Sequence, residues 1–493
     1  MVFGVFTATG CVQPAPIARE LDASAREDGG SSSDATSARD GGSLADAAPS
    51  ADASPDAGAG ADAVFTGWAQ VINDGVQAVG SAVAADAQGN VYVAGRIDGD
   101  TDFGGGVRQT TGSFYLASYA ADGRYRWDAL LGFTSQFIEQ NLVLTVDSGG
   151  RPVVAGTYTE LGREDAFVVT YDPTSGQRVG LRQFGGSGDD ELNAIAADDS
   201  GHVFVTGSVR GNVDVFGTSH SVQSNADVYV ARLAVAPDAS DWYRIYATTM
   251  TEAHGEAIAF RDGVVHFAGG FGGTITVGSS SFSGDFGDTF LGKVTPDGAS
   301  ASAIPLSSGG GGGLLELSAM AVSAEGTRYL IGRFRGGLTV GTTSLASIRS
   351  YDVFLCAVAS NDMVSWAHGY GQPSAGGLGG IDWGQALAID AQGDLLIAGA
   401  MNGGLDLGGR TLEIAIGDGE DVMFVASISA AGMTRWAIRG GSDYEDDIAH
   451  SVAALSDGSV LVAGTISGLG GLAGVVLPFN GGLRSGFVAR FAP

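Results

Sequence analysis

The sequence is poor in positive charge. Its 25 basic residues include a single lysine, Lys293, and they face 55 acidic residues, which gives a formal net charge of −30. An acidic surface repels nucleic acid and anionic lipid headgroups, so neither is expected as a partner. No run of 18 apolar residues occurs, which leaves no candidate for a membrane-spanning helix.

Cysteine is scarce, and the residue patterns of common catalytic and metal sites are missing. No G-x-S-x-G, H-E-x-x-H or C-x-x-C motif is present, which argues against a nucleophile elbow and the usual zinc sites. The six histidines share no repeat position and no ligand spacing. Of the two cysteines, Cys356 lies in the apolar run VFLCAV and is interpreted as a buried core residue.

The other cysteine, Cys11, marks the N-terminal region. The residues Ala8-Thr9-Gly10 before it resemble a bacterial lipobox, although a basic start is missing. We therefore interpret residues 1–11 as a shortened lipoprotein signal with the lipid on Cys11; a chance run of small residues is the alternative. Residues 12–63 are nearly all Ala, Ser, Asp, Gly and Pro, a composition that predicts a disordered tether.

What the sequence has in abundance is glycine, 81 of 493 residues, and an internal repeat from residue 64 onward. The block DAQGNVYVAG (86–95) returns as DAQGDLLIAG (390–399). Repeats of about 50 to 70 residues are typical of a solenoid, a propeller or an array. Seven copies of the block end on glycine: Gly95, Gly156, Gly207, Gly269, Gly332, Gly399 and Gly464.

Each copy divides into four predicted β-strands, which we name A to D in chain order. A turn with Gly, often preceded three residues earlier by Asp, joins A to B and indicates left-handed backbone at the glycine. Strand D often carries tryptophan, as at Trp127 and Trp242. Strand C opens with an aromatic residue in every copy, which predicts a shared packing role: Tyr115, Phe167, Tyr229, Phe290, Phe354, Phe424 and Phe487.

The two ends of the repeat region complement each other. The seventh copy stops after strand C at Pro493, while GWAQVIND (67–74) stands alone and has the strand D pattern, with Trp68. We therefore predict an all-β fold: a seven-bladed β-propeller of four-stranded antiparallel blades over residues 64–493. Its ring would be closed by the N-terminal strand 66–72, which completes blade 7 and leaves no open ring end.

The segment FGGSGDDELNAIAADDSGHVFVTG (184–207), followed by DVYVARL (227–233), resembles the bacterial SBBP repeat, a β-propeller repeat of secreted and surface proteins. The resemblance covers residues 64–493. Copies 2 and 4 lack the strand D tryptophan. The resemblance implies the propeller fold and an extracytoplasmic location, as an outer-membrane lipoprotein or a secreted protein. It implies no catalytic residues, because the family has none in common.

Carboxylates recur at fixed places in the repeat. Five copies carry Asp two or three residues before the strand C aromatic: Asp165, Asp227, Asp288, Asp352 and Asp421. Strands A and C run in the same direction, so the aspartates before strand C and the acids that open strand A lie on one face of the disc. The strand A acids would ring the mouth of the central channel. They bind either a cation, basic peptide or polyhydroxylated ligand, or only backbone N–H groups. The strand A acids are Glu139, Asp190, Glu252, Glu316, Asp382 and Asp447.

A second candidate site is the loop DGDTDFG (98–104). Asp98, Asp100 and Asp102 have the alternate spacing of a calcium loop, but the twelfth position is Gln109 and the other copies lack the triplet. Calcium is therefore a weak candidate here, and a solvated acidic loop is the alternative. No other cofactor is expected.

These observations favour a non-catalytic binding or scaffold propeller, monomeric, that presents an acidic loop face to a surface protein, peptide or glycan. Its contact with a membrane would be through the lipid alone. The alternative is a carbohydrate-active lyase or hydrolase with carboxylates at the channel mouth as acid and base. An active site should break the repeat symmetry, and GGSDYEDD (440–447) is the clearest such departure.

Overall fold

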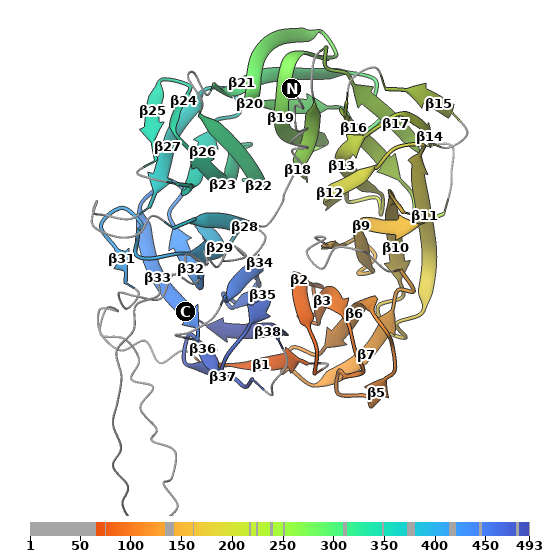
Figure 1. Ribbon diagram of the computed structural model, residues 1–493, viewed down its shortest axis with the longest axis vertical. Helices are drawn as coiled ribbons and strands as arrows, with labels where there is room; N and C mark the ends of the chain where they lie inside the picture. Colours follow the sequence, from red (N-terminus) through yellow and green to blue (C-terminus); the bar gives the residue numbers. More distant parts are fainter. Residues whose placement is uncertain are drawn as a thin grey trace, which may run out of the picture.

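The computed structural model describes residues 66–73, 75–133, 142–160, 162–215, 218–222, 225–236, 240–249, 252–308, 313–347, 350–371, 380–413, 421–442, 446–479 and 483–492. The regular elements of this part are all β-strands, and none of its segments is a helix long and apolar enough to cross a membrane. Seven antiparallel sheets stand around one axis, with strand A of each innermost (Figure 1). The predicted all-β, seven-bladed propeller is confirmed.

Every blade has the predicted order A, B, C, D from the axis to the rim. Blade 1 consists of β2 (Ala78–Ala85), β3 (Val91–Ile97), β6 (Ser113–Tyr119) and β7 (Tyr125–Leu130). Blade 2 consists of β8 (Val143–Val146), β9 (Pro152–Glu160), β10 (Arg163–Tyr171) and β11 (Arg178–Gly186). Blade 3 consists of β12 (Glu191–Ala197), β13 (Val203–Val209), β16 (Asp227–Leu233) and β17 (Trp242–Tyr246).

The remaining blades repeat this order. Blade 4 consists of β18 (Ala253–Arg261), β19 (Val264–Val277), β20 (Ser280–Val294) and β21 (Ala301–Ser308). Blade 5 consists of β22 (Leu314–Val322), β23 (Arg328–Arg335), β26 (Asp352–Val358) and β27 (Val364–Tyr370). Blade 6 consists of β28 (Trp383–Ile389), β29 (Leu395–Met401), β32 (Val422–Ile428) and β33 (Thr434–Gly441). Blade 7 consists of β34 (Ile448–Ala454), β35 (Val460–Ile466), β38 (Ser485–Ala492) and β1 (Thr66–Ile72).

Blade 7 confirms the predicted ring closure. Strand β1 pairs antiparallel with β38 along its whole length, with Trp68 opposite Arg490. The Trp68 indole also reaches the next blade, because its Nε1–H donates to the Ala121 carbonyl oxygen of blade 1 (3.0 Å). The first strand of the propeller thus completes the last sheet and ties it to the first.

The repeated glycine of strand B lies directly opposite the strand C aromatic in all seven blades, for example Gly95 opposite Tyr115. All seven aromatics are fully buried, which confirms their packing role. A Cβ on Gly95 would lie 1.9 Å from the Val79 carbonyl oxygen and 2.7 Å from the Tyr115 hydroxyl oxygen. Only glycine leaves room there for the backbone of strand A and the ring.

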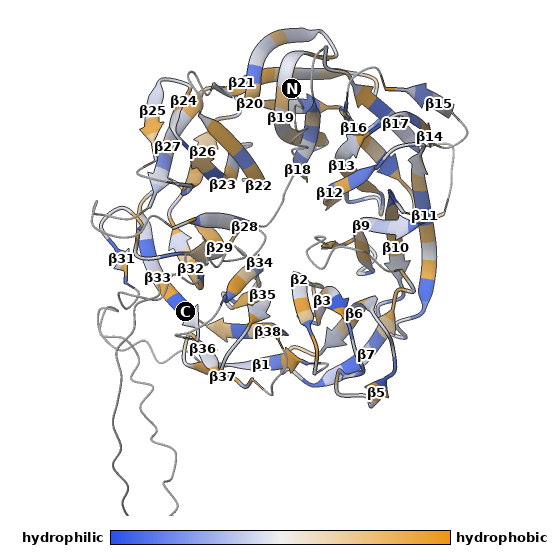
Figure 2. Ribbon diagram, viewed as in Figure 1, coloured by the Kyte–Doolittle hydropathy of each residue, from blue (hydrophilic) through white to orange (hydrophobic). Residues whose placement is uncertain are grey.

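Apolar side chains fill the space between neighbouring blades. Seven buried clusters correspond to the seven junctions, from Val93 and Leu461 between blades 1 and 7 to Leu355 and Ile397 between blades 5 and 6. Figure 2 shows hydrophobic residues along the strands of every blade. The ring is therefore held by one core cluster per junction, and not by a single central core.

The B–C connections form β-hairpins that overlap the preceding blade, which the sequence did not predict. Strand β14 (Asn212–Val215) pairs with β11, β24 (Gly337–Val340) with β21, and β36 (Gly470–Leu472) with β33. The strands that complete these hairpins, or form the smaller ones of blades 1 and 6, are β15 (Thr218–Ser221), β25 (Thr343–Ala346), β37 (Val475–Leu477), β4 (Thr101–Asp102), β5 (Val107–Arg108), β30 (Leu405–Asp406) and β31 (Thr411–Leu412).

The A–B turns have the predicted Asp–Gly chemistry. Asp86 Oδ1 accepts the backbone N–H groups of Gln88 (3.0 Å) and Asn90 (2.9 Å), and Gly89 has a φ of +79°. Asp147, Asp198 and Asp390 bond in the same way in their own turns. These aspartates are turn-forming residues, since the carboxylate satisfies two N–H groups that no strand uses.

Candidate functional site

The two faces of the disc carry different connections. We call the face with the D–A and B–C connections, such as residues 187–190 and 210–212, the mouth face. The face with the A–B and C–D turns, such as residues 86–90 and 120–124, is the turn face. On the mouth face the Asp190 N–H donates to the Glu164 carbonyl oxygen (2.8 Å) and the Asp447 N–H to that of Asp421 (2.8 Å). The two predicted sets of carboxylates therefore meet at junctions between neighbouring blades.

Three members of the predicted ring, Asp190, Asp382 and Asp447, occupy one equivalent position and are buried, with 0 to 2% of their surface exposed. Each lies directly before strand A, and its Oδ1 accepts the N–H of the residue three beyond the strand B glycine. The donors are Arg210 (3.0 Å), Asn402 (3.0 Å) and Ser467 (2.8 Å). These carboxylates hold the start of the B–C connection against strand A.

Burial raises the pKa of all three carboxyl groups because it removes the charged form from water. The pKa rises to about 7 for Asp190 and to about 6 for Asp447, and that of Asp382 rises well above its ordinary value. Backbone N–H donors oppose the effect without cancelling it. The bonds of these side chains account for the repetition of the residue type; that they bind a ligand or cation remains a prediction.

Glu252 and Glu316 occupy other positions, and each has a basic partner. Glu252 Oε2 lies 3.2 Å from His254 Nε2, and this contact lowers the pKa of Glu252. Glu316 Oε2 accepts a hydrogen bond from Arg333 Nε (2.6 Å). Aligning these acids by their distance from the A–B turn therefore combined residues from three different structural positions. Glu139, the sixth member, lies outside the described residues, as does Cys11.

In blades 1 and 3 to 7, one residue of strand A pairs across the sheet with the strand B glycine. The residue directly before it in strand A breaks the repeat symmetry. It is apolar in blades 1 and 7, where Val79 and Ile448 occupy it. In blades 3 to 6 it carries functional groups, and we call these four residues the arc: Glu191, His254, Glu316 and Trp383. Because blades 3 to 6 are consecutive, the arc is continuous along one side of the mouth face.

The arc residues are paired among themselves and with strand B. Glu191 Oε2 lies 4.0 Å from His254 Nδ1, and Glu191 Oε1 lies 3.6 Å from Arg210 Nη2. The Arg333 guanidinium, which binds Glu316, lies 4.2 Å from the centroid of the Trp383 ring and 4.6 Å from that of Tyr351. Cation–π contact and the ion pair fix this guanidinium in place.

A second polar set occupies the bulge of strand A and connects the innermost strands. The Leu317 N–H donates to Glu256 Oε2 (3.1 Å), from blade 5 to blade 4. Burial raises the pKa of Glu256 to about 8, so this carboxyl holds its proton at neutral pH. Equivalent contacts join Asn193 to Gly255 (3.0 Å), Ser318 to Trp383 (3.0 Å) and Gln385 to His450 (3.0 Å).

The three aspartates of the weak calcium candidate are each engaged within their hairpin. Asp98 Oδ1 lies 2.8 Å from Arg96 Nε. Asp100 Oδ1 accepts the Thr110 N–H (3.0 Å), and Asp102 Oδ1 accepts the N–H groups at 104 (2.8 Å) and 106 (2.9 Å). In the described part of the chain, no three His, Cys, Asp or Glu side chains are grouped so that they could hold a metal ion. The structure does not bring this triplet together as a calcium site.

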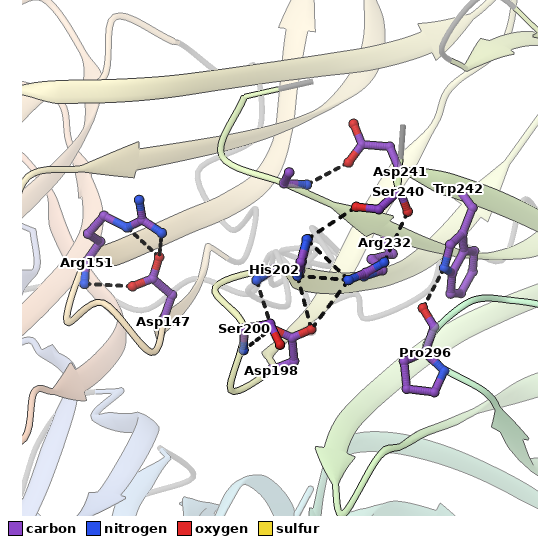
Figure 3. A network of polar contacts seen from close by, with 11 residues as sticks. Asp147, Arg151, Asp198, Ser200, His202, Arg232, Ser240, Asp241, Trp242 and Pro296 are labelled. Carbon is purple, nitrogen blue, oxygen red and sulfur yellow. Dashed lines mark hydrogen bonds and ion pairs between the residues drawn. The ribbon is translucent and has the colours of Figure 1, made fainter. Parts of the chain in front are cut away.

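The turn face holds a network with the residue types of a Ser–His–Asp site (Figure 3). His202 Nδ1 lies 3.3 Å from Asp198 Oδ2, and His202 Nε2 lies 3.3 Å from Ser240 Oγ. However, Arg232 Nη2 lies 2.9 Å from Nδ1 and 3.2 Å from Nε2. A guanidinium at both ring nitrogens competes for the lone pair that a general base needs, so we interpret the network as structural.

Sequence reasoning named Glu316 but missed the other three arc residues, because it looked for residues that recur. The signal was present in the register: after the strand B glycines are aligned, one strand A position changes from apolar to charged or aromatic in blades 3 to 6. The departure that was noticed, residues 440–447, contributes Asp446 and the buried Asp447 at the junction of blades 6 and 7.

Comparison with known proteins identifies no family for this chain. No family model matches the sequence, and no curated protein matches it. A europium-containing methanol dehydrogenase is similar in structure with a TM-score of 0.43 and 9% identity, covering 86% of this chain and 93% of that one. A polysaccharide lyase, Uly1, gives 0.43 and 10%, covering 84% and 90%. A protein of unknown function from Dyadobacter fermentans gives 0.42 and 10%, covering 87% and 99%.

Proposed function

We propose that this chain is a non-catalytic binding or scaffold propeller that is secreted or held in an outer membrane by a lipid on Cys11. Its partner would be a surface protein, peptide or glycan that meets the mouth face, and the chain would act as a monomer. Seven packed junctions and overlapping hairpins make the disc a firm support. Loops on such a support are where recognition is usually located.

The observation that carries this proposal is the state of the carboxylates on the mouth face. Acid–base catalysis on a glycoside needs two carboxyl groups that both reach the substrate. Asp190, Asp382 and Asp447 are buried and bonded to backbone N–H groups, and Glu316 is paired with Arg333. What remains is the arc, a set of charged and aromatic side chains held in place by one another. Glu191, His254 and Trp383 are only 6 to 9% exposed, so a polar ligand would first meet the Glu316 carboxylate, whose side chain is 27% exposed.

A carbohydrate-active lyase or hydrolase is the second candidate, and His254 is the observation that favours it. This imidazole lies between two carboxylates, Glu252 at 3.2 Å and Glu191 at 4.0 Å, and its Nδ1 has no hydrogen-bond partner among the described residues. A histidine oriented by a carboxylate is the commonest general base in enzymes. The reaction would then take place on the arc.

The test is to probe glycan and peptide arrays with the full-length protein and to assay each bound glycan for new reducing or unsaturated ends. The scaffold proposal expects binding without product, weakened at least about tenfold by Arg333→Ala, since hot-spot arginines often contribute more than 1 kcal/mol. Product that disappears in His254→Gln would establish the enzyme instead. Binding that Arg333→Ala and His254→Gln both leave unchanged would place the ligand elsewhere and refute the role of the arc.

A further inference from the structure

Blade 5 carries two arginines at the end of strand B, and only the inner one has an acidic partner among the described residues. Arg333 is buried, and its guanidinium binds Glu316 Oε2 through Nε (2.6 Å) and Nη2 (2.5 Å). Arg335 is the exposed last residue of β23, and the centroid of the Tyr351 ring lies 5.4 Å from its guanidinium carbon. In the described part of the chain, the Arg335 side chain makes no ion pair or hydrogen bond. The outer arginine therefore presents an unmatched positive charge on the mouth face.

Blade 1 fills the same two strand positions with a pair that neutralises itself. The residues one and three beyond the strand B glycine are Arg96 and Asp98 there, and Arg96 Nε lies 2.8 Å from Asp98 Oδ1. In blade 5 they are Arg333 and Arg335, and the inner arginine takes its carboxylate from strand A. Blade 5 thus has a hydrogen-bond donor on the mouth face at the position where blade 1 has an acceptor.

The Tyr351 ring beside this arginine is held from several sides. The strand register places Tyr351 across from Arg335, one step beyond the last pair of β23 and β26. Its hydroxyl donates to Glu316 Oε1 (3.3 Å), and its carbonyl oxygen accepts the Asp382 N–H of blade 6 (2.9 Å). The Arg333 guanidinium lies 4.6 Å from the ring centroid. The ring is therefore fixed in place before any ligand arrives, at the junction of blades 5 and 6.

The groups around Tyr351 differ in what they can still bond. The exposed Arg335 guanidinium can donate two parallel hydrogen bonds to one carboxylate. The Glu316 carboxylate, 27% exposed, accepts from Arg333 and Tyr351 and has further lone pairs for a donor such as a hydroxyl group. The aromatic ring offers an apolar surface next to both. A sugar ring that carries a carboxylate and hydroxyl groups has a counterpart for each of these three.

Neighbouring acids do not cancel the charge of the outer arginine. The Glu316 carboxylate is matched by Arg333. Asp352 points to the other side of the strand, where a Cβ on Gly371 would lie 2.5 Å from its Cγ. Asp382 is buried, and burial raises its pKa well above the ordinary value, which reduces its negative charge. One cation within an acidic face favours a ligand with a single carboxylate, because further acids, as in an acidic peptide, would be repelled.

We propose that Arg335, Tyr351 and Glu316 form a binding site for a saccharide unit that carries one carboxylate and several hydroxyl groups. Arg335 binds the carboxylate, Tyr351 packs against the sugar ring, and Glu316 accepts a hydrogen bond from a hydroxyl group. The proposal rests on the proposed binding function of the mouth face and names the class of its ligand. Because the guanidinium is exposed to water, binding should be modest and should weaken as salt is added.

The test is titration of the full-length protein, by isothermal calorimetry, with two acidic saccharides, glucuronosyl-xylotriose and sialyllactose, and with their neutral counterparts, xylotetraose and lactose. We expect one of the acidic saccharides to bind at least about fivefold more tightly than its neutral counterpart, which corresponds to about 1 kcal/mol. If neither binds up to about 10 mM, where a contact of this strength should be measurable, the proposal fails. A different ligand that still depends on Arg333 would then leave the binding function of the arc standing.

Matched variants locate the ligand. Arg335→Gln should weaken binding of the acidic saccharide at least about fivefold, because it removes a charge-assisted hydrogen bond. Arg163→Gln makes the same charge change at another exposed arginine of the mouth face and should alter binding less than about twofold. Tyr351→Phe keeps the ring and should retain most of the affinity, whereas Tyr351→Ala should lose it.

Two outcomes would overturn the proposal in different ways. Binding of the acidic saccharide that Arg335→Gln leaves unchanged, in a variant whose Tm equals that of the wild type, would refute the site. A hexaglutamate peptide that competes with equal affinity, and that Arg335→Gln also weakens, would show a carboxylate site without preference for a sugar, and the assignment to a saccharide would be wrong.

Discussion

The two faces of the disc treat the same residue type in opposite ways. On the turn face, carboxylates such as Asp122 and Asp172 are exposed and accept hydrogen bonds, from Arg124 and from Ser175 respectively, which lower their pKa. On the mouth face, burial raises the pKa of Asp190, Asp421 and Asp447. A repeated aspartate is thus a turn-forming residue on one face and an internal tie between blades on the other.

The difference follows from what surrounds each carboxylate. An aspartate in a tight turn bonds nearby N–H groups while water still solvates it, so its charged form is favoured. An aspartate between two blades bonds N–H groups in a dry junction, where desolvation outweighs them. The net charge of −30 therefore overstates the number of ionised groups, because part of it lies on acids that hold protons near neutral pH.

The largest expected effect is on the pH dependence of stability. Glu256, Asp190, Asp421 and Asp447 have pKa values raised to about 8, 7, 6 and 6 in the folded chain. The folded state then binds more protons than the unfolded state, so this stability is fully present below the unfolded pKa values of 3.8 to 4.5 and is lost as pH rises from there through the folded values of about 6 to 8. Urea unfolding in calcium-free buffer should show a fall of several kcal/mol between pH 5 and pH 8, since each pKa unit is worth about 1.4 kcal/mol. A flat profile would contradict the raised values.

Next in size is the removal of one buried acid, Asp447→Ala. It would leave the Ser442 and Ser467 N–H groups and the Ser442 hydroxyl without their acceptor inside the junction. The free energy of unfolding should fall by about 3 kcal/mol, because each unsatisfied buried group costs about 1 to 3 kcal/mol. Urea unfolding at pH 6 measures it. A loss below about 0.5 kcal/mol would mean that the loop relaxes to find water.

A smaller effect, of opposite sign, is expected for Glu256→Gln. The amide oxygen can still accept the Leu317 N–H, while the cost of ionisation disappears. The cost of ionising Glu256 grows as pH rises above the unfolded pKa of 4.5, so at pH 6 the variant should be more stable than the wild type by about 2 kcal/mol. At pH 4 the two proteins should unfold at the same urea concentration. An advantage that persists at pH 4 would point to better packing and not to ionisation.

The smallest effect is expected on the turn face, for Asp122→Asn. Asp122 pairs with Arg124 (2.6 Å), but both side chains are exposed, and ion pairs of that kind contribute little. The urea midpoint at pH 7 should stay within experimental error of the wild type. A clear loss of stability would show that the contrast between the two faces is not one of burial.

The sequence predicted the features that rest on local geometry and repetition. The aromatics at Tyr115 and its equivalents, the Asp–Gly turns and the closing strand at Trp68 all follow from patterns within one copy, or from the absence of a strand in the last copy. The SBBP resemblance implied the same fold, but no family model matches the chain.

The burial of Asp190 and the pairing of Glu316 with Arg333 did not follow from the sequence. Both depend on neighbours brought in from other strands or blades, and a bulge in strand A shifts the register at which they meet. The hairpins that overlap the preceding blade escaped for the same reason, since their partner strand belongs to the copy before.

The closing strand also sets how the disc is oriented toward whatever holds it. Strand β1 runs along the rim from the turn face to the mouth face, since its last residue, Ile72, leads into the D–A connection of blade 1 and its first, Thr66, pairs with Ala492 (Figure 1). A polypeptide that pulls on Thr66 therefore pulls from the turn-face edge. Were that polypeptide fixed to a surface, the arc and the acidic junctions would be directed outward, away from the point of attachment.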